Sequence, residues 1–539
     1  MRVLASISLA ALLSGAAFGQ STETPPAFDI ADVHVSPKTL TPNMSGGFLR
    51  GTRYEIRKAS MVDLVRLAYD VEPDKVLGGP NWLETDRFDV IAKAPASTPP
   101  ETAKVMLQTL LADRFKLVVH KDSKPLPAFV LSLGKGKPKM KESEGSGSPG
   151  CQGQPQTPQP GVVQYAIVAC HNMTMEALAQ NLRGMANAYI TNTVIDKTGL
   201  KGSWDFEIKW TARALLTQAG ADGITIFDAV DKQLGLKLEP QKVPTPVIYV
   251  DSVNRKPTDN PPGVITSLPP PPPTEFEVAD IKPSDPGATG QNGRIQNGRL
   301  DLHNFPLKDL ITIAWDINND LLAGAPKFLD SARYDVVAKA AAVTGGPANA
   351  QQVDIDTLRL MLRGLLIDRF NLKTHMEDRP VPAYTLSATG KPKLTKADPS
   401  NRTGCKEGPG PDGKDPRIAN PVLSRLISCQ NMTMAQLAEL LPSLAGGYVH
   451  TAVLDATGLE GAYDFTLSFS AVGLLQGGGP GQGGNAPPQA GGASGASDPN
   501  GALSLPDAIN KQLGLKFELQ KRPVPVLVID HVEEKPTEN

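Results

Sequence analysis

The stretch Asn172-Met-Thr-Met-Glu-Ala-Leu-Ala179 returns as Asn431-Met-Thr-Met-Ala-Gln-Leu-Ala438, and Lys232-Gln-Leu-Gly-Leu-Lys237 returns as Lys511-Gln-Leu-Gly-Leu-Lys516. This correspondence indicates a tandem duplication. In each copy a threonine is placed to cap a helix, and apolar side chains follow at the spacing of one helix face. These side chains are Met175, Leu178, Ala179 and Leu182 in the first copy and Met434, Leu437, Ala438 and Leu441 in the second. One face of each helix is therefore predicted to be buried.

A smaller repeat lies within each half, because a Pro-x-Pro motif precedes an apolar strand in two places per half. The four motifs are Pro125-Leu-Pro127, Pro244-Thr-Pro246, Pro380-Val-Pro382 and Pro523-Val-Pro525. A helix-like segment and a short strand lie upstream of each motif. The pattern predicts an α+β fold with two homologous domains, each built from two β-α-β-β-α-β-like units with helices packed on small mixed sheets.

Proline-rich residues 261–273 separate the halves and should form a stiff, extended spacer without a helix or a ladder. The boundaries that we predict are therefore 27–260 for the first domain, 261–273 for the linker and 274–539 for the second domain. A glycine-rich insertion at 476–501 has no counterpart in the first half and is expected to be disordered.

Residues 1–19 carry one early arginine, a short apolar run and small residues before a cleavable bond, which is typical of a secretory signal peptide. No later stretch offers the roughly 20 apolar residues of a membrane span. With 54 basic and 56 acidic residues, the net charge of -2 gives no basic patch for nucleic acid. We therefore expect a secreted or periplasmic protein with no membrane span after cleavage and no nucleic-acid partner.

The four cysteines fall two to a half, Cys151 with Cys170 and Cys405 with Cys429. In an exported protein, matched pairs suggest two local disulfides. A metal site is the alternative, but each half has only two thiols without Cys-x-x-Cys spacing, and His171 is replaced by Gln430. We predict two disulfides and no metal or cofactor site.

Five motifs together resemble the soil-associated exported protein family of Acidobacteria, a domain of unknown function that here occurs in two tandem copies. They are Phe276-Glu-Val-Ala-Asp-Ile-Lys-Pro-Ser284, Leu366-Ile-Asp-Arg-Phe-Asn-Leu372, Asn431-Met-Thr-Met-Ala-Gln-Leu-Ala438, Asp455-Ala-Thr-Gly-Leu-Glu-Gly-Ala-Tyr-Asp-Phe465 and Leu527-Val-Ile-Asp-His-Val-Glu-Glu-Lys-Pro-Thr-Glu-Asn539. The resemblance implies an exported protein and no defined reaction. A weaker resemblance links the order of elements to the short N-terminal domains of secretins and TonB-dependent receptors, which is an analogy of fold alone.

Three patterns are candidates for catalysis, and each has a structural alternative. His120 and His375 are the one histidine pair present in both halves, but no nucleophile-elbow serine accompanies them, which favours solvent-facing strand ends. Asp113 and Asp368, with Asp89 and Asp335, offer paired carboxylates, whereas Asp113-Arg114 and Asp368-Arg369 also suit ion pairs at helix ends. Asp196-Lys-Thr-Gly199 imitates the phosphorylation motif of ion pumps, but its counterpart Asp455-Ala-Thr-Gly458 lacks the lysine, so a turn is favoured.

No catalytic residue is therefore assigned. The leading hypothesis is an exported, non-catalytic tandem module that binds an envelope protein, a peptide or a cell-wall component, through strand edges after each Pro-x-Pro. The alternative is a hydrolase of an extracellular or cell-wall polymer, with the carboxylates near Asp113 and Asp368 in its cleft. A pocket shared by these acids with His120 or His375 would favour the hydrolase.

Overall fold

The computed structural model describes residues 25–37, 44–145, 147–155, 163–271, 274–296, 298–341, 353, 355–388, 390–399, 401–410, 413–420, 422–449, 451–472 and 501–538. The expected signal peptide, and all of the glycine-rich insertion except Gly501, lie outside these residues. Across the ranges just given, no helix has the length and apolar character needed to cross a membrane.

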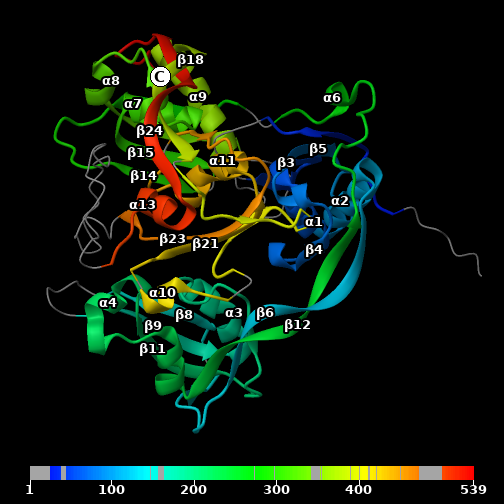
Figure 1. Ribbon diagram of the computed structural model, residues 1–539. Coiled ribbons are helices and arrows are strands. Elements are labelled where there is room, and N and C mark those ends of the chain that lie inside the picture. The colour runs from blue at the N-terminus through cyan, green and yellow to red at the C-terminus, as the bar shows by residue number, and fades with distance from the viewer. Residues whose placement is uncertain are drawn as a thin grey trace, which may run out of the picture.

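The chain folds into four lobes, numbered here in chain order (Figure 1). The first contains β1 (Ile30–Val35), β2 (Ser45–Arg50), β3 (Arg53–Ser60), α1 (Met61–Tyr69), β5 (Arg87–Lys93) and α2 (Pro100–Phe115). The second contains β7 (Lys141–Glu142), β8 (Gly150–Gln154), β9 (Tyr165–Met173), α3 (Met175–Met185), β11 (Trp204–Thr211), α4 (Leu216–Ala219) and α5 (Ile226–Ala229).

The third and fourth lobes repeat this plan. The third contains β13 (Val278–Pro283), β14 (Asn292–Gln296), β15 (Arg299–Pro306), α7 (Leu307–Trp315), α8 (Phe328–Ser331), β17 (Arg333–Lys339) and α9 (Ile355–Phe370). The fourth contains β19 (Thr395–Lys396), β20 (Gly404–Glu407), α10 (Pro416–Ala419), β21 (Arg425–Met432), α11 (Met434–Leu444), β23 (Tyr463–Phe469) and α13 (Leu505–Ala508). The fold is therefore α+β, as predicted, with small four-stranded sheets and helices in each homologous half.

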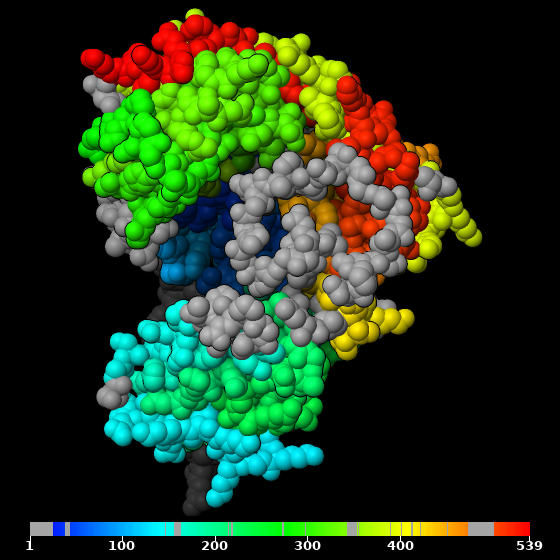
Figure 2. All heavy atoms as spheres, turned by 90° about the vertical axis from the view of Figure 1, so that its left-hand side faces the viewer, coloured from blue at the N-terminus to red at the C-terminus, as the bar shows by residue number. Residues whose placement is uncertain are grey.

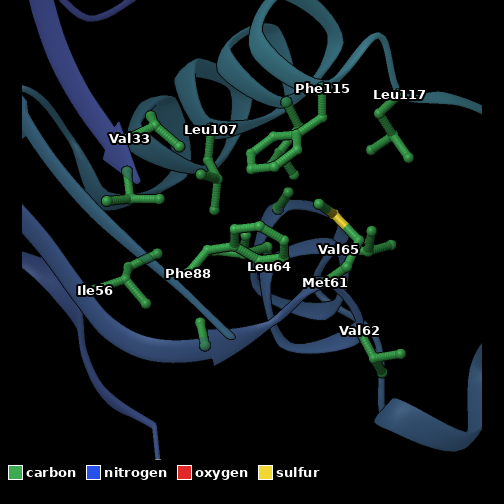
Figure 3. Packing of buried hydrophobic residues seen from close by; sticks show 14 of the residues in the cluster. Val33, Ile56, Met61, Val62, Leu64, Val65, Phe88, Leu107, Phe115 and Leu117 are labelled. Atoms are coloured by element: carbon green, nitrogen blue, oxygen red, sulfur yellow. The ribbon is translucent and has the colours of Figure 1, made fainter. Parts of the chain in front are cut away.

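The sheet of each lobe has the same order of strands. The orders are β1-β5-β3-β2, β7-β11-β9-β8, β13-β17-β15-β14 and β19-β23-β21-β20, and all pairs in them are antiparallel. Each lobe has a hydrophobic cluster of its own. In the first lobe, Phe88 of β5 packs between α1 and α2 (Figure 3). Its ring contacts that of Phe115 edge to face, with the ring centroids 4.9 Å apart. Separate cores agree with duplicated units.

The helix after each central strand begins where the sequence predicts. The hydroxyls of Thr174 and Thr433 accept hydrogen bonds from the N–H groups of Ala177 and Gln436, which caps α3 and α11. The apolar stripe of α3, from Met175 to Leu182, is buried, and the corresponding stripe of α11 is buried in the same way. These N-caps and buried faces are confirmed.

A left-handed bulge precedes the helix in all four lobes and is held by an aspartate. The bulged residues are Lys58 (φ 54), Asn172 (φ 50), Asn304 (φ 61) and Asn431 (φ 46). Their N–H groups donate to Asp89 at 2.9 Å, Asp205 at 2.8 Å, Asp335 at 2.9 Å and Asp464 at 2.7 Å, respectively. Positive φ is unfavourable for residues other than glycine, so each carboxylate stabilises a conformation that the chain alone disfavours. Asp89 and Asp335 therefore have a structural role, because each holds a bulge in place.

Two long antiparallel ribbons connect the lobes in pairs. β6 (Val118–Leu133) pairs with β12 (Leu236–Ser252) between the first and second lobes, and β18 (Lys373–Ala388) pairs with β24 (Leu515–His531) between the third and fourth (Figure 1). One end of the first ribbon enters the first core through Ile248 and Val250, and the other end enters the second core through Phe129 and Leu131.

The Pro-x-Pro motifs lie in the middle of these ribbons, which corrects the expectation that a separate strand follows each motif. Pro125 is opposite Pro244, and Pro380 is opposite Pro523. Alternate residues of an antiparallel pair point their N–H groups away from the partner strand. Because the prolines occupy only such positions, they remove no bond of the ladder, and each strand runs through its motif uninterrupted.

The linker packs against the first lobe and contains a short helix, where the sequence analysis predicts an extended spacer without one. This helix is α6 (Val264–Ser267), and Val264 is buried. The carbonyl oxygen of Pro269 accepts a 2.6 Å hydrogen bond from Arg53 of β3. Residues 272–273 lie outside the described residues.

Replacing the bulge-holding carboxylate should destabilise its lobe. Asp89 also accepts hydrogen bonds from the hydroxyl of Ser36 and from Arg57. We expect Asp89→Ala to lower the free energy of unfolding by about 1–3 kcal/mol, because the partly buried N–H of Lys58 loses its acceptor. Chemical denaturation measures this change. Asp113→Ala is the control, since the Asp113 side chain is 73% exposed, and its effect should stay within about 0.5 kcal/mol. Equal effects of the two substitutions would contradict the structural role.

The effect of Asp89→Ala should also depend on pH. Burial on its own would raise the pKa of Asp89, but hydrogen bonds from the Lys58 N–H, Ser36 and Arg57 outweigh it and lower the pKa. A lowered folded-state pKa adds stability above the ordinary aspartate pKa of about 3.9, and this stability is lost as the pH falls through the folded-state pKa. The difference between wild type and Asp89→Ala should therefore shrink below about pH 4.

Candidate functional site

The two expected cysteine pairs lie at disulfide distance in equivalent places. Cys151 of β8 is bonded to Cys170 of β9, and Cys405 of β20 to Cys429 of β21, with sulfur separations of 2.02 and 2.03 Å. In each case the two cysteines are directly opposite in the strand register. Each disulfide therefore ties a short edge strand to the sheet beside it.

The repeated histidines form hydrogen bonds with aspartates across the ribbons. Nδ1 of His120 lies 2.9 Å from the carboxylate of Asp251, and Nδ1 of His375 lies 2.9 Å from that of Asp530. Both histidine side chains are about half exposed. The aspartate partners were not predicted, although an aspartate follows the same apolar run near the end of β12 and β24, at Asp251 and Asp530.

The Asp-Arg-Phe motifs secure the end of each half, and the expected Asp113–Arg114 ion pair is wrong. Arg114 is buried and donates to the carbonyl oxygens of Ala31 and Thr258 and to the side chain of Asn260. Asp113 instead pairs with Lys116 at the exposed surface. In the third lobe Arg369 does lie 3.6 Å from Asp368, and its carbonyl oxygen accepts a bond from the Thr537 N–H, as that of Arg114 does from Thr258. In each half the arginine of the motif thus binds a Lys-Pro-Thr segment, at 256–258 and at 535–537.

The imitation of a phosphorylation motif is a turn in both halves. The carboxylate of Asp196 accepts from the Thr198 N–H at 2.8 Å, and that of Asp455 accepts from the Thr457 N–H at 2.9 Å. The following glycines have positive φ, 68° at Gly199 and 65° at Gly458. This is an aspartate turn closed by a left-handed glycine.

The strand edges proposed as binding sites are already paired. After their Pro-x-Pro motifs, β6 pairs with β10 (Val194–Asp196), and β12 pairs with β4 (Val76–Gly78). β18 and β24 pair in the same way with β22 (Val453–Ala456) and β16 (Leu322–Ala323). The expectation that these edges accept an added strand is therefore wrong.

Three of the cavities formed by described residues are well defined, and the catalytic candidates share none of these three. None is lined by Asp113, Asp368, His120 or His375. The same part of the chain contains no group of three or more His, Cys, Asp or Glu side chains placed to hold a metal. The smaller cavities measure about 210 Å³, between β2, β3 and α9, and about 250 Å³, beside β14 and β15. Paired carboxylates with a histidine in one pocket, the arrangement that would favour a hydrolase, are not found there.

The largest of these three cavities is a cleft of about 790 Å³ where three lobes meet. This volume falls within the about 300–1,000 Å³ typical of ligand sites. The first lobe contributes Ser60, Val62, Asp63, Glu72, Pro73, Asp74, Glu84 and Arg87; the second contributes Gln180, Arg183, Gly184, Asn187, Ile190, Thr191 and Asn192; the fourth contributes Cys405, Lys406 and Glu407. In Figure 1, α1 and β4 lie on one side of the fourth lobe's yellow segment and α3 on another. The cleft requires both halves of the chain.

An arginine from the second half holds one wall of this cleft. The guanidinium of Arg402 donates 2.6 Å hydrogen bonds to the carbonyl oxygens of Val76 and Gly78 and lies 3.5 Å from the carboxylate of Glu84. Burial lowers the pKa of Arg402, although the Glu84 carboxylate opposes that shift. The next residue, Thr403, donates its N–H to the carbonyl oxygen of Asn81 at 3.1 Å. The fourth lobe is thus anchored to β4 of the first.

A second buried contact joins the second and fourth lobes. The Asp415 carboxylate lies 2.9 Å from Arg417 and 3.4 Å from Arg213, and all three side chains are largely buried. Burial opposes ionisation of Asp415, but hydrogen bonds and attraction from the two arginines outweigh it and lower the pKa of Asp415. The second lobe is therefore fixed relative to the fourth. Figure 2 shows the blue first lobe set back between the third lobe above and the second lobe below.

Sequence reasoning missed this cleft because its walls come from distant segments. One signal was present. Three residues before the cysteine of the edge strand, the second half has Arg402 where the first half has Ser148. A buried charge that appears in one repeat alone indicates a contact that the other repeat does not make.

Comparison with known proteins identifies one family. The family model described as "Protein of unknown function (DUF3738)" matches residues 62–253 and 308–532. No curated protein matches the chain. No solved structure matches it either, so the resemblance to secretin and TonB-receptor domains stays a sequence-based expectation.

Removing the Arg402 anchor should loosen the contact between the halves. We expect Arg402→Ala to lower the free energy of unfolding by about 1–3 kcal/mol, because the partly buried carbonyl oxygens of Val76 and Gly78 lose their donors. Arg379→Ala is the control, since this arginine is 42% exposed on the second ribbon and its ion pair with Glu377 is worth at most about 1 kcal/mol. Chemical denaturation compares the two variants, and an Arg402→Ala effect no larger than the control would contradict the anchor.

Proposed function

The chain belongs to the family of proteins of unknown function DUF3738, whose domain it contains twice, and we propose that it is an exported, non-catalytic binding module of the bacterial envelope. Its partner is an envelope protein, a peptide or a cell-wall component. The binding site is the cleft between the first, second and fourth lobes.

The observation that carries this proposal is the construction of the cleft from both copies of the domain. Single copies contribute parts of its wall, and Arg402 and Asp415 hold those parts together through buried contacts. The volume of the cleft lies in the range of ligand sites, and its lining is mainly polar and charged, with Val62, Pro73 and Ile190 as apolar members.

Export is supported by two independent features, one of the sequence and one of the structure. The pattern of residues 1–19 is that of a secretory signal peptide. Two disulfides suit an oxidising compartment such as the periplasm or the exterior, because cytosolic thiols are kept reduced.

Filling the cleft should abolish partner binding while the fold persists. Gly184 is an exposed residue of α3 that lines the cleft, and a Cβ added to it would meet no heavy atom within 4 Å. Tryptophan is also a better helix former than glycine. We expect Gly184→Trp to reduce, by at least about tenfold, the recovery of any partner captured by the tagged full chain from envelope extracts, as measured by quantitative mass spectrometry; a loss of about 1.4 kcal/mol in binding is sufficient.

The matched control is Ser443→Trp. Ser443 occupies the corresponding position of α11, is exposed, and does not line the cleft. Its substitution should leave capture unchanged. If Gly184→Trp retains every partner that the wild type captures, the cleft is not the binding site and the proposal fails.

A further inference from the structure

The edge strands of the four sheets are joined to their sheets in two different ways. In the first and third lobes, residues 51–52 join β2 to β3 and residues 297–298 join β14 to β15. A connection this short fixes the register of an antiparallel pair. In the second and fourth lobes, residues 155–164 join β8 to β9 and residues 408–424 join β20 to β21. Connections of this length do not set the register, and these two pairs are the ones that a disulfide joins.

The disulfide of the fourth lobe lies directly after the anchor to the first lobe. Arg402 and the N–H of Thr403 donate to carbonyl oxygens of the first lobe. Gly404 passes so close to that lobe that a Cβ there would collide with the Glu84 carboxylate. The next residue, Cys405, is bonded through its sulfur to β21. The disulfide therefore connects the anchor to the core of the fourth lobe.

The anchor is fastened to the fourth lobe on both sides. On one side, the side-chain amide of Asn431 donates to the Asn401 carbonyl oxygen at 2.6 Å. On the other side lies β20, which has four residues and pairs with β21. Because only alternate residues of an antiparallel pair bond across it, β20 has few ladder bonds, and the disulfide supplies the stronger connection.

The equivalent disulfide of the second lobe has no anchor beside it. Cys151–Cys170 joins β8 to β9 in the same register as Cys405–Cys429 joins β20 to β21. In place of the two anchor residues, the second lobe has Ser148 and Pro149. Proline has no N–H to donate, and neither residue bonds to another lobe within the described part of the chain. The second lobe therefore provides a matched control for the disulfide of the fourth.

We propose that the Cys405–Cys429 disulfide is a redox-sensitive link between the two halves of the chain. While it is intact, separation of the first and fourth lobes requires the Arg402 and Thr403 bonds to break. Once it is reduced, β20 can leave β21 while those bonds persist, and the two lobes separate more readily. Reduction of the disulfide in the second lobe leaves their contact unchanged.

The reductant is a dithiol that reaches the bond through the cleft. Cys405 is partly exposed and lines the cleft, whereas Cys429 is buried. One thiolate of the dithiol attacks the Cys405 sulfur, the bond to Cys429 breaks, and the Cys429 thiolate takes a proton from solvent. The second thiolate of the dithiol then displaces the Cys405 thiolate, which also takes a proton. The dithiol, which has lost two electrons and two protons, becomes a disulfide.

The test measures the separation of the first and fourth lobes in the full chain with no partner added. Dyes are attached through ketone-bearing amino acids at Asp113 of the first lobe and Ala435 of the fourth, both of which are exposed. Single-molecule energy transfer between the dyes then reports the fraction of molecules in which the two lobes are apart.

Cys405→Ala combined with Cys429→Ala should raise this fraction by at least about tenfold, because a cross-link over this sequence separation is worth on the order of a hundredfold in the chain-entropy model. The matched control, Cys151→Ala combined with Cys170→Ala, should leave the fraction unchanged. Arg402→Ala removes the anchor itself and should also raise the fraction.

Reduction of the wild type keeps the inference testable if the alanine pair misfolds. Dithiothreitol, a dithiol, is added in steps, and the released thiols are alkylated and identified by mass spectrometry. The fraction of separated molecules should rise in step with alkylation of Cys405 and should not follow alkylation of Cys151.

A fraction that stays at the wild-type level without the Cys405–Cys429 bond, or that rises equally without the Cys151–Cys170 bond, overturns the inference. An unchanged fraction in Arg402→Ala does so as well, because the disulfide would then have no anchor to hold. Since no partner takes part, these outcomes leave the proposed binding function to the separate comparison of Gly184→Trp with wild type.

Discussion

The uninterrupted antiparallel ribbon is the constraint on which the rest of the structure depends. β12 contributes Ile248 and Val250 to the first core and Leu236 and Leu238 to the second, where Phe129 and Leu131 of β6 join them. Neither lobe can therefore lose its ribbon without opening its core. Pro125 opposite Pro244 preserves the ladder, because neither residue has a ladder bond to lose. The ribbon therefore joins the two lobes through their cores.

Duplication repeated this two-lobe unit, but the copies are placed in different surroundings. The fourth lobe contacts the first through Arg402 and the second through Asp415, whereas the edge strand β8 of the second lobe lines no described cavity. The equivalent strands β8 and β20 therefore differ, because β20 lines the cleft and β8 does not. Gly184 lines the cleft and its counterpart Ser443 does not, and Arg402 contacts the first lobe where the first half has Ser148.

Features governed by neighbours along the chain were predictable. Thr174 and Thr433 cap helices because a hydroxyl satisfies an N–H three residues away, and the aspartate turns at Asp196 and Asp455 close within two residues. Features governed by distant partners were not predictable. Arg114 was expected to pair with adjacent Asp113, but it contacts Ala31, Thr258 and Asn260 instead. The strands after Pro-x-Pro were predicted as free edges because nothing local shows that β10 and β4 cover them.

Repetition, cysteine pairing and helix periodicity are written in the order of residues, so the duplicated α+β architecture could be read without coordinates. The cleft could not, because Asp74, Gly184 and Glu407 are far apart in the chain and meet only after two ribbons and two buried arginine contacts have placed their lobes. Local patterns specify which elements form, since capping and burial act over a few residues. Which surfaces then face each other depends on the packing of whole lobes, and that packing determines where a ligand can bind.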